Sequence, residues 1–185
     1  MSVEEYVAGT SSEVSGNCKL WIDKTLALLP QAARILEIGS AFGRDARYIE
    51  SFGFKVECTD ATEGFVDRLQ QMGYSASLLN ILSDDIAVRY DLIFANAVFL
   101  HFTPEEFKQT LLKIRGCLNS GGVLSFSVKK GEGEEWSTNK IGRTRYFCYW
   151  NEEKLRAALE LSNFESISIL EDGLFLQIIA KAKMD

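Results

Sequence analysis

The sequence predicts an α/β protein in three layers, with helices on both faces of a mostly parallel sheet and an antiparallel hairpin at its C-terminal end. Strand-like and helix-like segments alternate along most of the chain, which is the pattern of a parallel sheet with crossover helices. Near the C-terminus, Asp172-Gly173 separates two apolar segments and signals a tight hairpin. A length of 185 residues with 46% hydrophobic content predicts one domain over residues 17–185, without an internal linker.

The first 16 residues are polar and small. They predict a flexible N-terminal arm or a lid over the site, although a frayed terminus explains them equally well. Residues 17–29 have apolar positions at helical spacing, and Asn17 is a plausible cap of that helix. Residues 33–38 are almost continuously apolar, which is typical of a strand buried on both faces.

A glycine turn, residues 39–43, links this strand to a helix expected over residues 44–52. Its two glycines allow a sharp turn where open α/β sheets bind ligands, at the carboxyl end of a parallel strand. A dinucleotide site needs G-x-G-x-x-G, but Ala41 and Arg44 occupy the second and third glycine positions. The spacing therefore argues against a dinucleotide.

The second strand, residues 54–59, ends at Asp60. A carboxylate at this strand end can accept hydrogen bonds from both hydroxyls of a ribose, so Asp60 indicates a cofactor that contains a nucleoside. Asp60 also stands where it would cap the next helix, residues 62–72, and that interpretation stays open.

The third and fourth strands also lead into polar side chains. Residues 74–79 precede Asn80, and residues 90–95 precede Asn96 and an apolar run that ends at His101. His101 is the only histidine of the chain, and its ordinary pKa suits a general base for a hydroxyl or thiol. A packed residue that orients the loop explains His101 equally well.

Several of these stretches resemble the class I S-adenosylmethionine-dependent methyltransferases, in their small-molecule branch. Glu37 followed by residues 39–43 (GSAFG) is similar to the family's first motif, E/D-x-G-x-G-x-G, with Ala41 in place of the middle glycine. Asp60 matches the family's acidic strand end. Residues 90–102 (YDLIFANAVFLHF) resemble the fourth motif and lack the N/D-P-P-Y/F signature of the branches that methylate adenine and glutamine amino groups.

The resemblance implies a Rossmann-like sheet of seven strands, with S-adenosyl-L-methionine as cofactor and S-adenosyl-L-homocysteine as its product. It implies methyl transfer to an oxygen, nitrogen or sulfur atom of a small molecule. The residues that it places at the cofactor are Glu37, Gly39, Ser40, Ala41, Gly43, Asp60, Ala61, Asn80 and Asn96. In this arrangement Asp60 would bind the ribose, Ala61 would lie beside the adenine ring, and Asn80 would accept a hydrogen bond from the adenine amine. An ordinary turn residue would look the same as Asn80.

The resemblance also places two residues at the methyl acceptor. His101 would face the methyl group and act as the catalytic residue, and Tyr6 in the N-terminal arm would close over the site.

The second half of the chain continues the alternation. The elements expected there are a helix over 103–118 begun by a capping box of Thr103 and Glu106, a turn at 119–122, a strand over 122–128, a helix over 151–161 capped by Asn151, and hairpin strands over 164–170 and 174–182. Residues 129–146 are rich in glycine and charge, and so long a loop in a compact domain is uncommon unless it is functional or disordered. We expect a substrate flap there, while a solvated excursion stays open. Its candidate anion-binding residues are Lys129, Arg143 and Arg145, and its candidate apolar residues are Trp136, Tyr146 and Phe147.

Composition narrows the function classes. A formal net charge of −6 argues against a broad nucleic-acid surface. The sequence has no membrane-length apolar run and no N-terminal signal pattern, so we expect a cytoplasmic protein. Four scattered cysteines and one histidine support neither a metal site nor a disulfide framework. A monomer and a homodimer both stay open, as do two other functions: a nicotinamide-dependent oxidoreductase and a non-catalytic cofactor-binding or partner protein.

Overall fold

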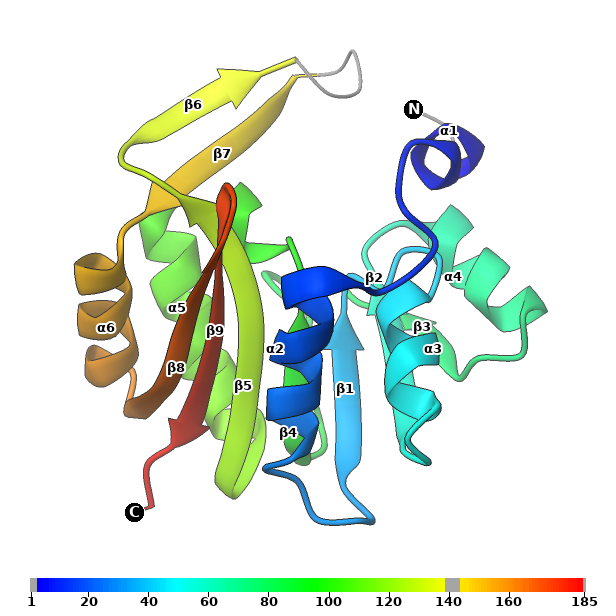
Figure 1. Cartoon of the computed structure of the whole chain (residues 1–185), viewed down its shortest axis with the longest axis horizontal. Helices are drawn as coiled ribbons and strands as arrows, with labels where there is room; N and C mark the ends of the chain where they lie inside the picture. Colours follow the sequence, from blue (N-terminus) through cyan, green and yellow to red (C-terminus); the bar gives the residue numbers. More distant parts are fainter. Residues whose placement is uncertain (1–2, 139–143, 185) are drawn as a thin grey trace.

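A mixed β-sheet runs through the centre of the protein (Figure 1). The structure is a computed structural model that describes residues 3–138 and 144–184. The strands in these ranges are β1 (Arg34–Ile38), β2 (Lys55–Asp60), β3 (Ala76–Leu78), β4 (Tyr90–Ala95), β5 (Leu118–Lys130), β6 (Glu134–Ser137), β7 (Arg145–Trp150), β8 (Phe164–Asp172) and β9 (Phe175–Ala182). The helices are α1 (Val3–Ala8), α2 (Gly16–Leu26), α3 (Arg44–Glu50), α4 (Glu63–Gln71), α5 (Pro104–Cys117) and α6 (Glu152–Leu161), with a short 3-10 helix η1 (Phe99–His101).

Seven of the described strands form the main sheet, in the order β3-β2-β1-β4-β5-β9-β8. The first five run parallel to one another, β9 is antiparallel to β5, and β8 is antiparallel to β9. The predicted seven-stranded sheet with a C-terminal antiparallel hairpin is therefore confirmed. Because β1, β2 and β4 are parallel, the loops that follow them meet at one edge of the sheet.

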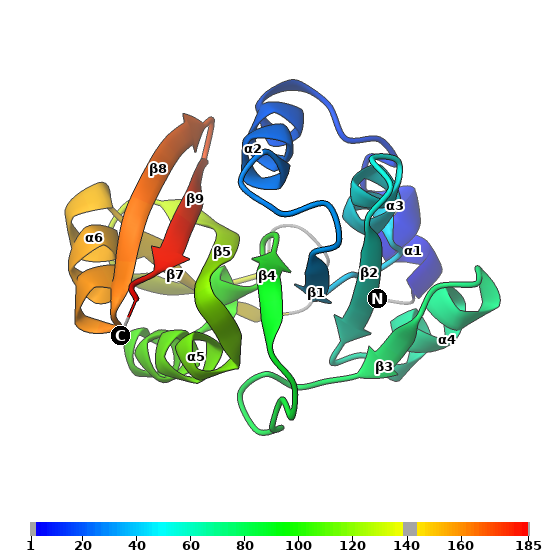
Figure 2. The ribbon, with the colours of Figure 1, turned by 90° about the horizontal axis from the view of Figure 1, so that it is seen from below.

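Helices cover both faces of this sheet. Figure 2 shows α2 and α3 on one face and α5 on the other. Trp21 of α2 packs against Phe94 of β4, with ring centres 4.8 Å apart, in one hydrophobic core. Phe107 of α5 packs against Trp150 of β7, with ring centres 4.5 Å apart, in the other. Each such buried aromatic side chain contributes about 2 kcal/mol of hydrophobic stabilisation, so the two cores fix the sheet between its helices.

Two helix caps predicted from the sequence are confirmed. The Thr103 hydroxyl accepts a hydrogen bond from the Glu106 backbone N–H, and the Glu106 carboxylate accepts one from the Thr103 backbone N–H at 2.8 Å. Asn151 caps α6 by accepting a hydrogen bond from the backbone N–H of Lys154 at 2.9 Å. These caps depend only on neighbouring residues, which is why the sequence specifies them.

Two other local expectations are wrong by a residue or two. Helix α2 already begins at Gly16, so Asn17 lies inside it, and its side chain donates a hydrogen bond to Asp172 at 3.2 Å instead. Asp172 is the last residue of β8, so the hairpin turn consists of Gly173 and Leu174. Gly173 supplies the positive φ of 57° that this turn requires.

The turn expected at residues 119–122 lies within β5, where the pairing between β4 and β5 shifts register. Gly121, with a φ of 70°, accommodates this irregularity.

The prediction of a loop over residues 129–146 is also wrong for the described residues of this segment, because β6 and β7 form an antiparallel hairpin there. The register pairs Ser137 with Arg145, and β7 then continues as a parallel neighbour of β5. Residues 145–150 (RYFCYW) are rich in aromatic side chains, which favour extended structure. Arg143 lies outside the described residues.

The N-terminal arm contains the short helix α1, which the sequence did not indicate. Tyr6 of this helix packs against the rings of Phe42 and Phe65, with ring centres 6.4 Å and 5.4 Å away. Of the helices in the described ranges, the longest has 14 residues, and none has the length and apolar character of a membrane span.

Candidate active site

Two adjoining cavities lie at the carboxyl ends of β1, β4 and β5. The first has a volume of about 260 Å³ and is walled by the glycine turn, the end of β4 and the β8-β9 hairpin. The second has a volume of about 320 Å³ and lies between η1, the end of β5 and the β6-β7 hairpin. Tyr6, Ala97 and Phe175 line both cavities. Molecules bound in the two cavities would therefore be neighbours.

The glycine turn forms one wall of the first cavity. Gly39 has a φ of 72°, and a Cβ atom there would lie only 2.5 Å from Cγ2 of Val98. Gly43 has a φ of 77°, and a Cβ atom there would lie 2.9 Å from a methyl group of Leu69. The left-handed φ values, together with these close neighbours, therefore favour glycine at both positions. Ala41 has a φ of 48°, a left-handed conformation that costs a residue with a Cβ atom about 1 kcal/mol.

Asp60 holds this turn in place. Its carboxylate accepts hydrogen bonds from the backbone N–H groups of Ala41, at 3.0 Å, and Thr62, at 2.8 Å. Burial raises the pKa of Asp60, while these two hydrogen bonds act in the opposite direction. Asp60 thus braces the glycine turn and the start of α4 together, and it is not among the residues that line the first cavity.

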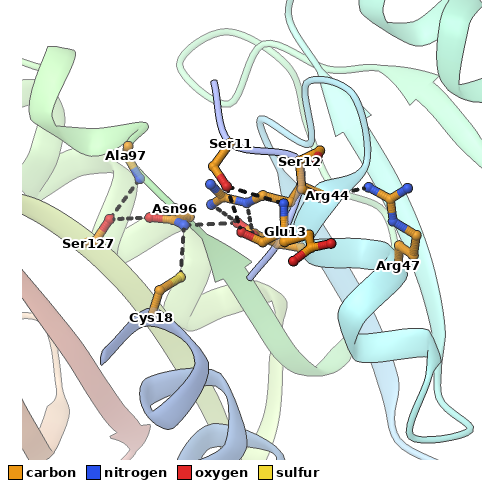
Figure 3. A network of polar contacts seen from close by, with 10 residues as sticks. Ser11, Ser12, Glu13, Cys18, Arg44, Arg47, Asn96, Ala97 and Ser127 are labelled. Atoms are coloured by element: carbon orange, nitrogen blue, oxygen red, sulfur yellow. Dashed lines mark hydrogen bonds and ion pairs between the residues drawn. The ribbon is translucent and has the colours of Figure 1, made fainter. Parts of the chain in front are cut away.

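A polar network forms the floor of the first cavity (Figure 3). The Asp45 carboxylate accepts hydrogen bonds from Arg44 at 2.7 Å and from the Asn96 amide at 2.9 Å. The Ser127 hydroxyl donates to the Asn96 amide oxygen at 2.7 Å and accepts from the Ala97 backbone N–H at 2.8 Å. The network therefore ties the start of α3, the end of β4 and β5 to one another, with a carboxylate at its centre.

Glu37 lies beneath the glycine turn in β1 and is 2% exposed. Burial, together with the negative charge of Asp45, raises the pKa of Glu37 to about 8. The side chain is therefore largely neutral at pH 7. Its neighbours include the thiol of Cys58, which donates to the Glu37 carboxyl group at 4.0 Å, and the side chain of Ser40.

The β8-β9 hairpin supplies the opposite wall of the first cavity. The Asp172 carboxylate is part of this wall. It accepts hydrogen bonds from Asn17 at 3.2 Å and from the Gln177 amide at 3.3 Å. Gln177 is 4% exposed, and its amide oxygen has no hydrogen-bond partner in the described part of the chain. A buried acceptor without a partner leaves this wall ready for a donor from a bound molecule.

His101 lies in the second cavity with a defined protonation pattern. Its Nδ1 atom lies 2.8 Å from the backbone carbonyl oxygen of Tyr146. Because a carbonyl oxygen only accepts, Nδ1 carries the hydrogen and Nε2 of the neutral ring is bare. Burial lowers the pKa of His101 below its ordinary value, and the hydrogen bond to Tyr146, which acts to raise it, is outweighed by burial and the charges of Arg145 and Lys129. The neutral ring is therefore favoured at pH 7. A bare Nε2 can accept a proton from a bound molecule.

The alternation of β7 determines which of its side chains reach this cavity. Arg145, Phe147 and Tyr149 line it, together with Lys129 of β5 and Glu135 of β6. The alternate residues of β7 face the hydrophobic core instead. As a result, the second cavity combines two cations and one carboxylate with aromatic rings.

The structure brings most of the predicted residues to the cavities. Those in the first cavity are Tyr6, Gly39, Ser40, Ala41 and Asn96, and those in the second are Tyr6, His101, Lys129, Arg145 and Phe147. The predicted residues that line neither cavity are Glu37, Gly43, Asp60, Ala61, Asn80, Trp136 and Tyr146.

Three of these residues have other environments than expected. Asn80 is exposed, and its amide oxygen accepts a hydrogen bond from the Leu82 backbone N–H at 3.1 Å, as in an ordinary turn. Tyr146 reaches His101 only through its backbone carbonyl, and its ring packs on Trp136, with centres 5.5 Å apart. Trp136 and Tyr146 do not line the second cavity, because the strand alternation turns them to the other face.

Several cavity residues were missed by sequence reasoning. Asp45, Ser127 and Gln177 carry no local signal, since the segments that bring them together lie far apart in the chain. Tyr149 could have been found if residues 145–150 had been taken for a strand. In residues 3–138 and 144–184, no group of three or more His, Cys, Asp or Glu side chains is arranged to hold a metal ion.

Comparison with known proteins gives a consistent picture. A family model described as a methyltransferase domain matches residues 12–169. No match was found among curated proteins.

Solved structures resemble the fold over most of the chain. An S-adenosylmethionine-dependent methyltransferase from Methanosarcina mazei has a TM-score of 0.75 at 16% identity, covering 86% of this chain and 97% of its own. An amino pentose methyltransferase from Micromonospora echinaspora, with S-adenosylmethionine bound, has a TM-score of 0.72 at 16% identity, covering 99% and 98%. The 1,6-didemethyltoxoflavin-N1-methyltransferase from Burkholderia thailandensis, with its substrate and S-adenosylhomocysteine bound, has a TM-score of 0.67 at 20% identity, covering 98% and 87%. At these identities the likeness establishes the fold.

Proposed function

Because the chain belongs to the methyltransferase domain family, we propose that it transfers a methyl group from S-adenosylmethionine to an oxygen, nitrogen or sulfur atom of a small molecule. The protein is an S-adenosylmethionine-dependent enzyme. The observation that best supports a small-molecule acceptor is the pair of adjoining cavities, one at the glycine turn and one beside His101.

The first cavity suits the charge of this cofactor. S-adenosylmethionine carries a positive sulfonium, an ammonium group and a carboxylate, and when bound it supplies an electrophilic methyl group. The cavity offers the carboxylates of Asp45 and Asp172 and the unpartnered amide oxygen of Gln177 as acceptors, with Arg44 as a cation. These groups complement a zwitterionic amino acid with an additional positive charge.

The same charges disfavour a nicotinamide dinucleotide. Its pyrophosphate is an anion that needs free backbone N–H groups at a glycine turn and at a helix N-terminus. Here the N–H of Ala41 is already bonded to Asp60, and Asp45 stands in the first turn of α3. A dinucleotide would thus meet carboxylates where it needs donors.

We assign roles to the predicted residues as follows. Gly39, Ser40 and Ala41 shape the wall that contacts the methionine part, and Glu37 supports it from beneath. By resemblance, Asp60 binds the ribose, Ala61 lies beside the adenine ring and Asn80 meets its amine. For Asp60 to do so, its carboxylate must use lone pairs that the two backbone N–H groups leave available.

In the second cavity His101 is the proposed catalytic residue, because its bare Nε2 can take the proton of a hydroxyl or thiol. Tyr6 and Phe175 line both cavities and would hold the acceptor beside the cofactor. Positioning of the acceptor in line with the methyl group and sulfur supplies much of the rate in such a transfer. We further propose a cytoplasmic location and a monomer or homodimer, on the sequence argument alone.

Calorimetric titration with S-adenosylmethionine, S-adenosylhomocysteine and NADH tests the proposed cofactor site. We expect one-to-one binding of both sulfur nucleosides at micromolar strength, about −8 kcal/mol, and no binding of NADH. Asp45→Asn should weaken this binding about tenfold, since it removes a cavity carboxylate, whereas Asp67→Asn on the exposed face of α4 should not change it. Binding of NADH alone would overturn the assignment.

Tight cofactor binding without turnover would favour the non-catalytic alternative. The decisive experiment is methyl transfer to a broad panel of small metabolites, with formation of S-adenosylhomocysteine as the readout. No product from any member of the panel, together with stabilisation by a protein partner, would support a binding protein that has lost its activity.

A further inference from the structure

Two cationic side chains in the second cavity have no carboxylate partner among the described residues. The Lys129 ammonium lies 3.8 Å from the centre of the Phe147 ring, and the Arg145 guanidinium lies 5.1 Å from the same ring. Within residues 3–138 and 144–184, neither cation forms an ion pair. This is unusual in a chain with a net charge of −6, where carboxylates outnumber cations.

The neighbouring Lys130 shows the contrast. It forms an ion pair with Glu171 at 2.6 Å and does not line the cavity. Lys129 instead rests on two aromatic rings, those of Phe147 and Tyr149. Cation–π contacts orient these cations but leave their charge uncompensated, so an anion can still pair with them.

One carboxylate does line the cavity. Glu135 accepts a hydrogen bond from the Tyr149 hydroxyl and so has a partner of its own. The cations Lys129 and Arg145 line the same cavity, and His101 is neutral. The described lining therefore carries a net positive charge. Apart from Ser137, the remaining walls are apolar or aromatic, with Leu100 and Phe175 among them. The cavity therefore favours a small anion with an apolar body.

We propose that the acceptor is a small anion with a hydroxyl group, whose carboxylate or phosphate pairs with Lys129 and Arg145 while the hydroxyl donates to Nε2 of His101. This inference rests on the proposed function and specifies its substrate class. In the transfer the hydroxyl oxygen forms a bond to the methyl carbon, the carbon–sulfur bond breaks and its electron pair stays on sulfur. The hydroxyl proton passes to Nε2 of His101, which becomes an imidazolium and later returns the proton to water.

Binding of anionic probes to the protein saturated with S-adenosylhomocysteine tests the cation pair. The probes are benzoate, salicylate and phenyl phosphate, with salicylamide as the neutral analogue of salicylate. We expect at least one anion to bind about tenfold more tightly than salicylamide, and the comparison of benzoate with phenyl phosphate distinguishes a carboxylate from a phosphate site.

Matched variants locate this binding. Lys129→Gln and Arg145→Gln should each weaken the anion about tenfold and leave the affinity for S-adenosylhomocysteine unchanged, whereas Lys130→Gln should change neither. Equal binding of salicylate and salicylamide, or binding that Lys129→Gln and Arg145→Gln leave intact, would overturn the cation pair while leaving the cofactor assignment in place.

The same titrations without S-adenosylhomocysteine keep the two proposals separate. Anion binding that depends on Lys129 and Arg145 would support the acceptor site even if no sulfur nucleoside bound. Failure of all three anions in both forms of the protein would refute it.

Nitrogen-15 NMR of the imidazole tests the role of His101. Because the chain has one histidine, its ring nitrogens give one pair of signals. At neutral pH we expect Nδ1 protonated and Nε2 bare, and we expect the Nε2 signal to move when salicylate binds but not when benzoate binds, since only salicylate has a hydroxyl to donate. A protonated Nε2, or equal shifts with both probes, would contradict the proton-accepting role.

Discussion

Glu37→Gln should stabilise the protein at high pH, because it removes the penalty of a buried negative charge. The glutamate is fully enclosed beneath the glycine turn, and burial with the charge of Asp45 raises its pKa from the ordinary 4.5 to about 8. Glutamine has the shape of the protonated acid and never ionises. The comparison of the two side chains therefore isolates the cost of the charge.

The pH window follows from these two values. Below pH 4.5 the carboxyl group is protonated in both the folded and the unfolded chain, so it carries no penalty. Between pH 4.5 and 8 the folded protein holds the proton and the unfolded chain releases it, so stability falls as pH rises. The slope is about 1.4 kcal/mol per pH unit, and the accumulated difference reaches about 5 kcal/mol as an upper bound, because a buried charge draws in water and polar groups.

Urea unfolding of wild type and Glu37→Gln at intervals from pH 5 to pH 9 measures this difference. At pH 5 the variant should be nearly as stable as wild type. Its advantage in the free energy of unfolding should grow toward pH 8 and stay constant above pH 8. A difference that does not depend on pH, or a variant that is less stable at pH 9, would refute the reasoning.

Glu57→Gln is the matched control with the opposite sign. Burial acts to raise the pKa of Glu57, but hydrogen bonds from Arg34 at 2.8 Å and Tyr90 at 2.7 Å outweigh it and lower the pKa. The ionised form therefore stabilises the fold, and this contribution is lost as pH falls. Glu57→Gln should be less stable than wild type at neutral pH and should approach it in acid, so the two variants should move in opposite directions.

Three further predictions concern the site and its supports. Ala41→Gly relieves a φ of 48° and should change the dissociation constant of S-adenosylhomocysteine by less than about threefold, as measured by calorimetry; a larger gain in affinity would mean that Ala41 impairs the site. Ser127→Ala breaks the link between Asn96 and the Ala97 N–H and should weaken cofactor binding about tenfold while the far-UV circular dichroism stays unchanged; unchanged affinity would show that the link is dispensable. Thr103→Ala removes the capping box of α5 and should lower the free energy of unfolding by about 1 kcal/mol without changing cofactor affinity; an unaltered urea midpoint would contradict it.

The parts of the fold that short-range rules determine were predictable from the sequence. The apolar runs of β1 and β4, the cap at Thr103 and the Asp-Gly hairpin signal depend on neighbouring residues or on burial of a whole strand. The β6-β7 hairpin was not predictable in this way. The sequence that leads into it is rich in glycine and charge, and aromatic side chains occupy both the core face and the cavity face of β7. No alternation of apolar and polar residues therefore marks β7, and only its aromatic composition favours a strand.

In the candidate site, too, residues that belong to a short motif were predictable, and residues that are brought together by long-range contacts were not. The glycine turn and Asp60 were found because a short motif carries them, but the motif did not reveal that Asp60 braces the turn through Ala41. Asp45 was not found, since its partner Asn96 lies 51 positions away in the chain. Contacts of that range are set by how the strands assemble, and no local pattern records them.

The charges of the two cavities bear on the reaction as a whole. Carboxylates of Asp45 and Asp172 line the first, and the cations Lys129 and Arg145 line the second. In the proposed reaction the positive methyl donor and the anionic acceptor would each meet opposite charges, while Ala97 and Phe175 line both cavities and offer no charge. In the proposed transfer the sulfur loses its positive charge, and the hydroxyl proton that passes to His101 places a positive charge in the second cavity. The positive charge thus moves toward the anion of the proposed acceptor, which can stabilise the imidazolium as it forms, and an interaction that strengthens toward the transition state accelerates a reaction.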